Sequence, residues 1–391
     1  YHGKTHAFKD MALSVLPYLL KASLEEIGDE NKILILVATS GDTGKAALEG
    51  FKNVDGVEAM VFYPEGGVSE IQRLQMASQE GENLDVFSII GNFDVAQTAV
   101  KKAFTDKEFQ KELLDLGYEL SSANSINIGR LVPQIIYYVY SYLRLVKSGQ
   151  IEMNNPINVC VPTGNFGNIL ASYYAKRMGL PIDKLIVASN ENNVLTEFFT
   201  SGSYNSDRDL HLTSSPSMDI LVSSNLERFL YHLSSANTTK ISKAMENLDK
   251  DKNYIWGDFE EDLIFAGFAD EDEISQAINL CYDNFSYVVD PHTAVAYSVY
   301  REYKEFSGDE KPTLIASTAS PYKFPGKILS SLGKEVPKDE FQRLEDLSEL
   351  SHIDIPEDLT KLKTAKIIHD KVIEANQMQD IIKETIGGKN V

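Results

Sequence analysis

Cysteine is scarce in this chain. Cys160 and Cys281 are the two cysteines among its 391 residues. Two thiols are too few for a disulfide framework and cannot supply a four-thiolate zinc or iron–sulfur site. We therefore expect a protein of a reducing compartment, and the cytoplasm fits.

Long apolar runs and an excess of basic residues are missing as well. No apolar stretch reaches the roughly 20 residues that a helix needs to cross a bilayer, and the most apolar run, residues 32–38, has the length of a strand. Acidic residues number 58 and basic residues 37, which gives a net charge of −21. This charge repels a phosphodiester backbone and an anionic membrane surface. We therefore expect neither nucleic acid nor a membrane as a partner, and the oligomeric state is left open.

The length and the first residues bear on domain organisation. At roughly 150 residues per domain, the chain has room for about two or three domains. It opens with Tyr1-His2-Gly3 and without Met, so we expect the N-terminus of the gene product to lie further upstream, with a removed targeting peptide as an open alternative. The break at Asn154-Asn155-Pro156 predicts a domain boundary near residue 150.

Apolar runs of strand length alternate with helical patterns along most of the chain. Such alternation predicts an α/β fold with parallel sheets covered by helices, and ligands bound at the carboxyl ends of the strands. The predicted strands are 32–38, 58–63, 85–90, 157–161, 184–189 and 313–317, and the predicted helices are 11–20, 43–51, 69–79, 94–104, 130–147, 168–178 and 291–304.

The sharpest local motif is Val-Pro-Thr-Gly-Asn-Phe-Gly-Asn at residues 161–168, between a predicted buried strand and a helix. Gly164 and Gly167 allow the backbone to approach a ligand closely, and the N–H groups at a helix N-terminus face an anion. The motif therefore predicts a phosphate cradle, although an ordinary turn between strand and helix is the alternative. It contains no G-x-G-x-x-G fingerprint and no terminal Lys-Ser/Thr pair, so nucleotide binding loses support.

A second loop, residues 39–46, joins a predicted strand to a helix. It fails as a P-loop because Thr39 stands where the first Gly belongs and Ala46 where the last hydroxyl belongs. Asp42-Thr43-Gly44 matches the tripeptide of aspartic proteases, but those enzymes need two such tripeptides on paired β-barrels, and we reject that match. The hydroxyls and backbone N–H groups at this helix start suit a carboxylate, with helix capping as the alternative.

The first ten residues carry a third candidate site. His2, His6 and Asp10 have four-residue spacing, but Gly3 weakens a helix there and the other histidines supply no second ligand cluster, so we expect no metal. Lys9 beside Phe8 is a candidate for an amine kept neutral enough to attack a carbonyl. A solvated surface lysine is the alternative.

Two aromatic features are interpreted as structural. The tyrosines of residues 137–142 point around several faces of one helix without interleaved basic residues, so core packing is favoured over base stacking. His292 stands at a helix start, where hydrogen bonding around the cap is favoured over catalysis.

Five motifs together resemble the threonine synthase family in order and spacing, from the first residue to about Phe324. They are Ala-Phe-Lys-Asp at 7–10, Ser-Gly-Asp-Thr-Gly at 40–44, Asn-Ser-Ile-Asn at 124–127 with Arg130, Pro-Thr-Gly-Asn-Phe-Gly-Asn at 162–168, and Ser-Thr-Ala-Ser-Pro-Tyr-Lys-Phe at 317–324. The resemblance implies a pyridoxal-phosphate enzyme of the tryptophan-synthase-β-like architecture (fold type II). It also implies the conversion of O-phospho-L-homoserine and water to L-threonine and phosphate.

The same resemblance implies a role for each matching residue. Lys9 corresponds to the lysine that forms the Schiff base with the cofactor and then acts in γ-phosphate elimination and water addition at Cβ. The cofactor phosphate is assigned to Gly164, Asn165, Phe166, Gly167 and Asn168, and the pyridine nitrogen to Thr318. The substrate carboxylate is assigned to Thr39, Ser40, Asp42 and Thr43, and the substrate phosphate to Asn124, Ser125 and Arg130.

The resemblance also implies a division of the chain and shows two departures. Residues 1–20 and 151–391 are expected to form the larger cofactor-binding α/β domain, which ends in C-terminal helices. Residues 21–150 are expected to form the smaller α/β domain, which carries the substrate-binding loops. A further domain upstream of the lysine motif is expected to be missing from this sequence. The family often has His where this chain has Ser320 and Pro where it has Lys4, so contacts at the pyridine edge and charge near the site are expected to differ.

Two alternatives stay open. Another fold-type-II enzyme, such as an amino-acid phospholyase or a threonine/serine dehydratase, would use the same cofactor for a different reaction. A catalytically silent homologue could instead sense a phosphorylated metabolite. Arg130 beside Asn124 and Ser125 favours a phosphorylated substrate.

Overall fold

The computed structural model describes residues 1–257, 259 and 262–389. Two compact units are present: Tyr1–Arg130 together with Asp354–Val391, and Leu131–Ile353. This division differs from the predicted one, which grouped residues 1–20 with 151–391. The end of the chain adds a strand to the first sheet, and the helix that begins at Lys9 packs in the core of the same unit.

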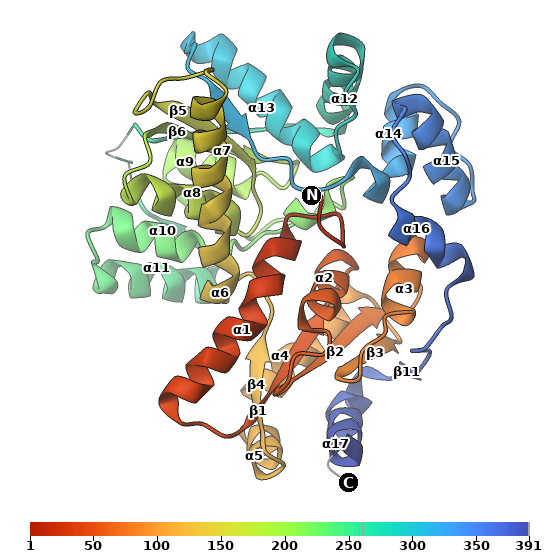
Figure 1. Cartoon of the computed structure of the whole chain (residues 1–391). Coiled ribbons are helices and arrows are strands. Elements are labelled where there is room, and N and C mark those ends of the chain that lie inside the picture. The colour runs from red at the N-terminus through yellow and green to blue at the C-terminus, as the bar shows by residue number, and fades with distance from the viewer. Residues whose placement is uncertain (258, 260–261, 390–391) are drawn as a thin grey trace. The chain divides into compact units, whose positions relative to one another are not determined.

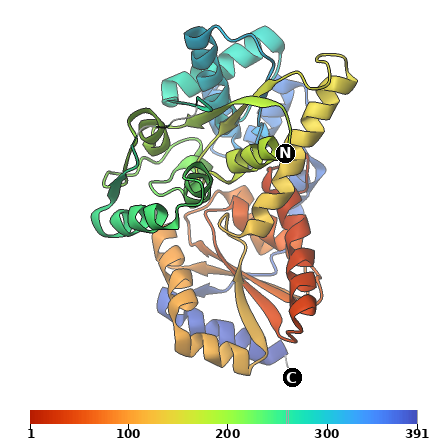
Figure 2. The ribbon, with the colours of Figure 1, turned by 90° about the vertical axis from the view of Figure 1, so that its left-hand side faces the viewer.

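The first unit is built on a five-stranded parallel sheet with the order β11-β3-β2-β1-β4 (Figure 1). Helices cover both of its faces, as Figure 2 shows for the lower part of the ribbon. The strands are β1 Lys32–Ala38, β2 Val57–Pro64, β3 Leu84–Ile89, β4 Tyr118–Ser122 and β11 Val372–Ile373. On one face lie α1 Lys9–Ile27, α2 Asp42–Phe51 and α3 Glu70–Ala77, and on the other α4 Phe93–Thr105, α5 Lys107–Asp115 and α17 Met378–Lys389.

The position of β1 in the sheet explains why its sequence is apolar throughout and does not alternate between apolar and polar residues. Ile33 and Ile35 pack in the core beneath α1 and α2, whereas Leu34 and Leu36 pack beneath α4. A parallel strand that is covered on both faces needs apolar side chains at every position.

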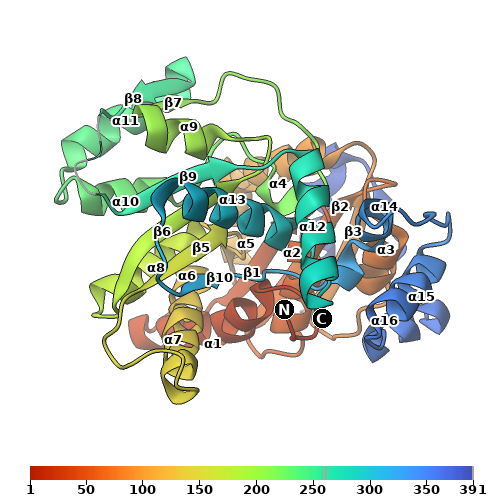
Figure 3. The same cartoon turned by 90° about the horizontal axis from the view of Figure 1, so that it is seen from above.

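The second unit has a four-stranded parallel sheet with the order β10-β5-β6-β9 (Figure 3). A hydrophobic core packs helices against one face of this sheet, and on the other face the Cys160 thiol of β5 donates to the Ala296 carbonyl of α13 at 3.2 Å. The strands are β5 Ile157–Pro162, β6 Ile182–Ser189, β9 Ile264–Phe268 and β10 Thr313–Ile315, and β7 Ser203–Asn205 pairs with β8 Asn253–Ile255. The helices are α7 Ile135–Lys147, α8 Gly167–Arg177, α9 Val194–Ser201, α10 Leu226–Leu233, α11 Thr238–Asp251, α12 Glu271–Phe285, α13 Pro291–Ser307, α14 Pro325–Ser331 and α15 Glu340–Ser351.

Strand order marks a switch point in each sheet. In the first sheet β1 lies between β2 and β4, and in the second β5 lies between β6 and β10. Successive connections leave the sheet in opposite directions at these places, and ligands of open α/β sheets bind there, outside the carboxyl ends of the strands. The predicted substrate loops follow β1 and β4, and the predicted cofactor segments follow β5 and β10.

The parallel α/β prediction is confirmed, with local corrections. The predicted helix 130–147 is divided into α6 Ile128–Leu131, a 3-10 turn that contains Pro133, and α7. Asn92 caps α4, because its side chain accepts the N–H of Val95, and Asp94 lies in the first turn of this helix. Within the described residues, none of the helices has both the length and the apolar character needed to span a bilayer.

The tyrosine cluster is mostly structural. Tyr138 and Tyr142 are buried in the second core, as the packing interpretation predicted, but Tyr140 is 61% exposed.

Candidate active site

The predicted phosphate cradle connects β5 to α8 in the second unit. Among the described residues, no protein acceptor is found for the backbone N–H groups of residues 164–168. The carbonyls on the same segment are held from outside: Gly164 accepts from the Ser223 hydroxyl at 2.8 Å, and Asn165 accepts from the Asn225 amide side chain at 2.9 Å. Fixed carbonyls and unused N–H groups at the start of a helix are the arrangement that an anion requires.

Phe166 anchors the turn of the cradle. It precedes α8 in the left-handed conformation, with φ of 59°, which costs a residue with a side chain about 1 kcal/mol or more. Its ring is 2% exposed and lies 5.3 Å from the ring of Phe229 and 5.7 Å from that of Phe199. Burial of the ring offsets the backbone strain, so Phe166 acts from behind the cradle through packing.

The two cradle glycines differ in what surrounds them. A Cβ on Gly164 would lie 2.9 Å from the Ser217 carbonyl oxygen and 3.1 Å from the Met218 Cα, whereas a Cβ on Gly167 would meet one atom, the Asn225 amide nitrogen at 3.5 Å. Gly164 is therefore needed by the protein itself. The space in front of Gly167 is left open, which fits a cofactor phosphate held by the adjacent N–H groups.

Asn168 ends the cradle and has a partner that the sequence analysis missed. The Tyr138 hydroxyl of α7 donates to the Asn168 side-chain oxygen and lies 3.2 Å from the Asn168 carbonyl oxygen. Both residues are buried. Tyr138 lies 30 positions before Asn168 in the sequence, and no local pattern indicates that they meet.

Thr318 follows β10 at the same edge of the second sheet. Because β10 and β5 are parallel neighbours, with Ile315 opposite Cys160, the segment after β10 and the cradle after β5 emerge side by side. Thr318 is 7% exposed, and its hydroxyl has no hydrogen-bond partner among the described residues. Ser320, one of the two departures from the family, caps the next 3-10 turn by accepting the N–H of Tyr322.

The loop after β1 is tightly organised around Thr39. The Thr39 hydroxyl accepts the backbone N–H groups of Gly41 and Gly44, each at 2.9 Å. These two hydrogen bonds use the lone pairs of the oxygen, so its proton is the part that can be offered to a carboxylate. Capping and carboxylate binding are thus compatible, and Asp42 accepts from Gln72 of α3 at 3.1 Å.

The loop after β4 lies next to this one at the first switch point, since Leu36 of β1 pairs with Ser122 of β4. Arg130 is 4% exposed, and one of its guanidinium nitrogens donates to the Ala123 carbonyl at 2.9 Å, which fixes the plane of the group. Asn124 is exposed and Ser125 is half-buried. The residues predicted to bind the two substrate anions therefore belong to adjacent loops.

Lys9 is the first residue of α1, two positions earlier than the predicted helix start. It is 8% exposed, and its Nζ lies 5.0 Å from the centre of the Phe8 ring. The surface-lysine alternative is wrong for this position. Helix α1 also packs against the loop after β4 that contains Arg130, because a Cβ on Gly129 would lie 2.5 Å from the Leu16 side chain.

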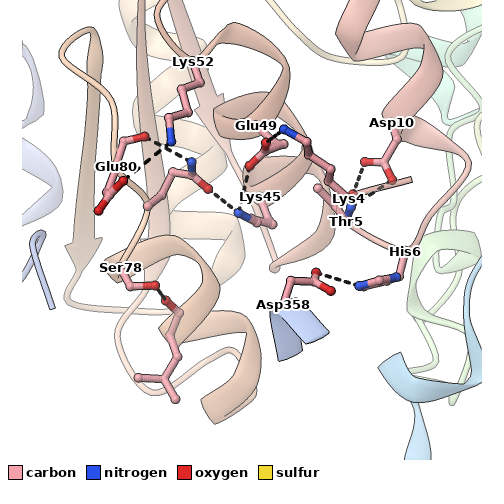
Figure 4. A network of polar contacts seen from close by, with 12 residues as sticks. Lys4, Thr5, His6, Asp10, Lys45, Glu49, Lys52, Ser78, Glu80 and Asp358 are labelled. Carbon is pink, nitrogen blue, oxygen red and sulfur yellow. Dashed lines mark hydrogen bonds and ion pairs between the residues drawn. The ribbon is translucent and has the colours of Figure 1, made fainter. Parts of the chain in front are cut away.

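A polar network holds the segment before Lys9 in place (Figure 4). His6 lies 2.7 Å from Asp358, and Asp10 accepts the backbone N–H and the hydroxyl of Thr5. Lys4, the second departure from the family, forms a 2.7 Å ion pair with Glu49 of α2. None of the described residues forms a group of three or more side chains able to hold a metal.

Two pKa values in this network are shifted. Burial lowers the pKa of Lys45 against the opposing effect of Glu49. Burial also acts to raise the pKa of Glu49, but the hydrogen bond from Lys4 and the charge of Lys45 together lower it. Both side chains belong to α2, and the predicted carboxylate loop leads into the first turn of this helix.

His292 forms the hydrogen bonding around the helix cap that was favoured for it. Asp290 caps α13 by accepting the backbone N–H groups of His292 and Thr293, and the His292 ring lies 2.8 Å from the same carboxylate.

Comparisons with known proteins agree with this arrangement. The family described as pyridoxal-phosphate dependent enzyme matches residues 1–318, and the family described as threonine synthase, C-terminal, matches residues 293–366. The chain is 41% identical over 344 residues to threonine synthase-like 1 of Pongo abelii, with 85% of this chain and 45% of that protein covered. The chain thus spans less than half the length of that relative.

Threonine synthases are covered more completely. The chain is 38% identical over 332 residues to the threonine synthase of Pseudomonas aeruginosa, with 84% of this chain and 68% of that protein covered. A crystal structure of threonine synthase from Brucella melitensis with bound PLP is 34% identical, has a TM-score of 0.85, and covers 99% of this chain and 76% of that one. The chain therefore belongs to the threonine synthase family of fold-type-II, pyridoxal-phosphate-dependent enzymes.

Proposed function

We propose that this protein is a threonine synthase that converts O-phospho-L-homoserine and water to L-threonine and phosphate. The observation that carries the proposal is the first switch point. There the hydroxyl-rich loop of Thr39 and the loop of the buried Arg130 follow neighbouring strands. This pair of loops suits a small molecule with a carboxylate at one end and a phosphate at the other.

The cofactor site belongs to the second unit in this proposal. The backbone N–H groups of residues 164–168 hold the cofactor phosphate, and the Thr318 hydroxyl meets the pyridine nitrogen. When bound, pyridoxal phosphate supplies an electron sink for negative charge that develops on the amino-acid skeleton. A neutral hydroxyl cannot keep the pyridine ring protonated as a carboxylate would, and this moderates the sink.

The chain's own residues position the substrate and move its protons. The Lys9 amine carries the cofactor and transfers protons at Cα. The loop of Thr39 orients the substrate carboxylate, and Arg130 with Asn124 and Ser125 orients the phosphate that departs from Cγ. Water then adds at Cβ, so phosphate and threonine are the two products.

Lys9 can be tested directly. Borohydride reduction of the holoenzyme followed by peptide mapping should place the pyridoxyl label on Lys9. Lys9→Ala should fold and lose the visible absorption band of the bound cofactor. A label on another lysine would refute the assignment.

Arg130 tests the substrate. A guanidinium can form two parallel charge-assisted hydrogen bonds with a phosphate, and an ammonium cannot reproduce that fork. Arg130→Lys should therefore lower kcat/KM for O-phospho-L-homoserine by about a hundredfold, which corresponds to roughly 2.7 kcal/mol, and leave the cofactor spectrum unchanged. Arg144→Lys, in an exposed position of α7, is the matched control. Unchanged kinetics of Arg130→Lys would remove Arg130 from the site.

An amino-acid phospholyase is the second candidate, since the relative with 41% identity is named threonine synthase-like 1 and does not carry the plain threonine synthase name. Product analysis separates the two: threonine supports the synthase, and 2-oxobutanoate as the main product supports a lyase. We propose the cytoplasm as the compartment, which suits two buried, free cysteines.

A further inference from the structure

Asp290 is a fully buried carboxylate at the start of α13, with 0% exposure. It accepts four hydrogen bonds. Two come from the backbone N–H groups of His292 and Thr293, at 2.9 and 3.3 Å. The others come from the His292 ring at 2.8 Å and from the Thr293 hydroxyl. Backbone capping accounts for two of these contacts, and the two side-chain contacts extend to other segments.

The direction of each side-chain hydrogen bond follows from the carboxylate, which can only accept. The Thr293 hydroxyl donates its proton to Asp290, so at 3.2 Å from the Ser317 hydroxyl it must act as the acceptor, with Ser317 as donor. The His292 Nδ1 donates to Asp290, and its Nε2 accepts the backbone N–H of Ser217 at 3.2 Å. One carboxylate therefore sets the donors and acceptors of two chains of hydrogen bonds.

These chains end on the two segments that border the cofactor cradle. Ser317 immediately precedes Thr318. Ser217 and Met218 supply the backbone atoms against which Gly164 is packed, at 2.9 and 3.1 Å from the position of a Cβ. Neither segment is next to α13 in the sequence, so Asp290 joins three distant parts of the second unit.

We propose that Asp290 is a positioning residue for the cofactor: through Thr293 and Ser317 it fixes Thr318, and through His292 and Ser217 it fixes the wall behind Gly164. The inference rests on the proposed cofactor site, and does not depend on which amino acid is the substrate. Asp290 touches no reacting atom and acts by holding both walls of the site at once.

The test measures the affinity of the apoprotein for pyridoxal 5′-phosphate by absorbance titration, together with thermal unfolding of the apoprotein. Thr293→Val removes the hydroxyl that links Asp290 to Ser317 and keeps the shape of the side chain, Thr293→Ser keeps the hydroxyl, and Ser317→Ala removes the other end of the same bond. Thr196→Val is the matched control, since the Thr196 hydroxyl of α9 donates to the Gly267 carbonyl at 2.7 Å in the same unit.

A positioning role predicts a specific pattern. Ser317→Ala should raise the Kd for pyridoxal phosphate about three- to tenfold, the range expected for one lost hydrogen bond. Thr293→Val also removes the hydrogen bond to Asp290 and should raise the Kd at least as much. The double variant should be no worse than Thr293→Val alone, because Thr293→Val already removes the hydrogen bond that Ser317→Ala removes. Thr293→Ser should bind as the wild type, and Thr196→Val should keep the wild-type Kd.

Two results would overturn the inference: a wild-type Kd in both single variants, or additive losses in the double variant. If Thr293→Val does not fold, Ser317→Ala decides alone, with a wild-type Kd counting against the proposal. Turnover is not part of this test. Failure of the enzyme to convert O-phospho-L-homoserine would refute the proposed reaction and leave these Kd values interpretable.

Discussion

Alanine at Gly164 and alanine at Gly167 should have opposite effects, although the two glycines lie three residues apart in one loop. A Cβ at position 164 meets backbone atoms at 2.9 and 3.1 Å, and backbone cannot rotate aside as a flexible side chain can. A Cβ at position 167 meets the Asn225 amide at 3.5 Å, which is an ordinary contact. Gly167 also lies outside the left-handed region, so alanine is not strained there.

The magnitudes follow from these contacts. Overpacking costs about 1–3 kcal/mol, and each kcal/mol lowers the unfolding temperature of a unit of this size by about 2–4 °C. Gly164→Ala should therefore lower the apoprotein's unfolding temperature by about 2–12 °C. Gly167→Ala should leave it unchanged or raise it slightly, because alanine is favoured over glycine in a helix by up to about 1 kcal/mol.

Cofactor affinity, in contrast to stability, should be sensitive to alanine at position 167. The methyl group of Gly167→Ala enters the space assigned to the phosphate, and hydrogen bonds to a charged group contribute about 1.5–3 kcal/mol each. The Kd for pyridoxal phosphate should rise by about tenfold or more. Differential scanning calorimetry of the apoprotein and absorbance titration with the cofactor measure the two effects separately.

Gly326→Ala is the control for this pair. Gly326 is the second residue of α14, its Cβ would meet nothing closer than 3.6 Å, and it lies outside the predicted site. Gly326→Ala should shift the unfolding temperature by no more than a few degrees. It should leave the Kd for pyridoxal phosphate unchanged. Wild-type affinity in Gly167→Ala would place the phosphate elsewhere, and wild-type stability in Gly164→Ala would mean that residues 217–218 yield easily.

Three further results are expected. Tyr138→Phe removes the hydroxyl that holds Asn168 and should weaken cofactor binding about threefold to tenfold in the same titration, whereas an unchanged Kd would show that Asn168 holds its position alone. Burial raises the pKa of the Cys160 thiol, so Cys160 should resist a thiol reagent at pH 8 until the protein unfolds, and rapid labelling of the native protein would contradict its burial. The lowered pKa of Glu49 favours its charged form in the folded state; the associated stability is present above its ordinary value of 4.5 and is lost as pH falls through the folded pKa. Urea unfolding between pH 6 and 3 should show a smaller loss for Lys4→Ala than for the wild type, and equal losses would mean that this ion pair contributes nothing.

Most strands could be predicted from the sequence because their physics is local. Residues 32–38 are apolar at every position, since both faces of β1 are covered, and the predicted limits match those of the strand. The helix predicted at 11–20 is longer in the structure, from Lys9 to Ile27. Its start at Lys9 has no side-chain cap that a sequence pattern could reveal, and the segment is held by contacts from Glu49 and Asp358.

The sequence predicted those parts of the candidate site that a single loop forms. It did not predict the parts that depend on contacts between distant segments. The cradle of residues 164–168 is a single stretch, so its glycines and the following helix are visible in the sequence. Asp290 is connected to Ser317 through Thr293, and Ser317 lies 24 positions after Thr293. Asp290 is connected to Ser217 through His292, and Ser217 lies 75 positions before His292. No periodicity connects such positions, and the contacts exist only once the second sheet has formed.

The pairing of β11 with β3 has a consequence for synthesis of the protein. Val372 and Ile373 lie near the end of the chain, after the whole of the second unit, so the first sheet must wait for its last strand. During that interval β3 is an open edge, and the core beneath α4 lacks Met378, Ile382 and Ile386 of α17. An open strand edge beside uncovered apolar surface is a site for aggregation and for chaperone binding. A stop codon soon after residue 353 should therefore yield a chain whose second unit folds and whose first unit aggregates.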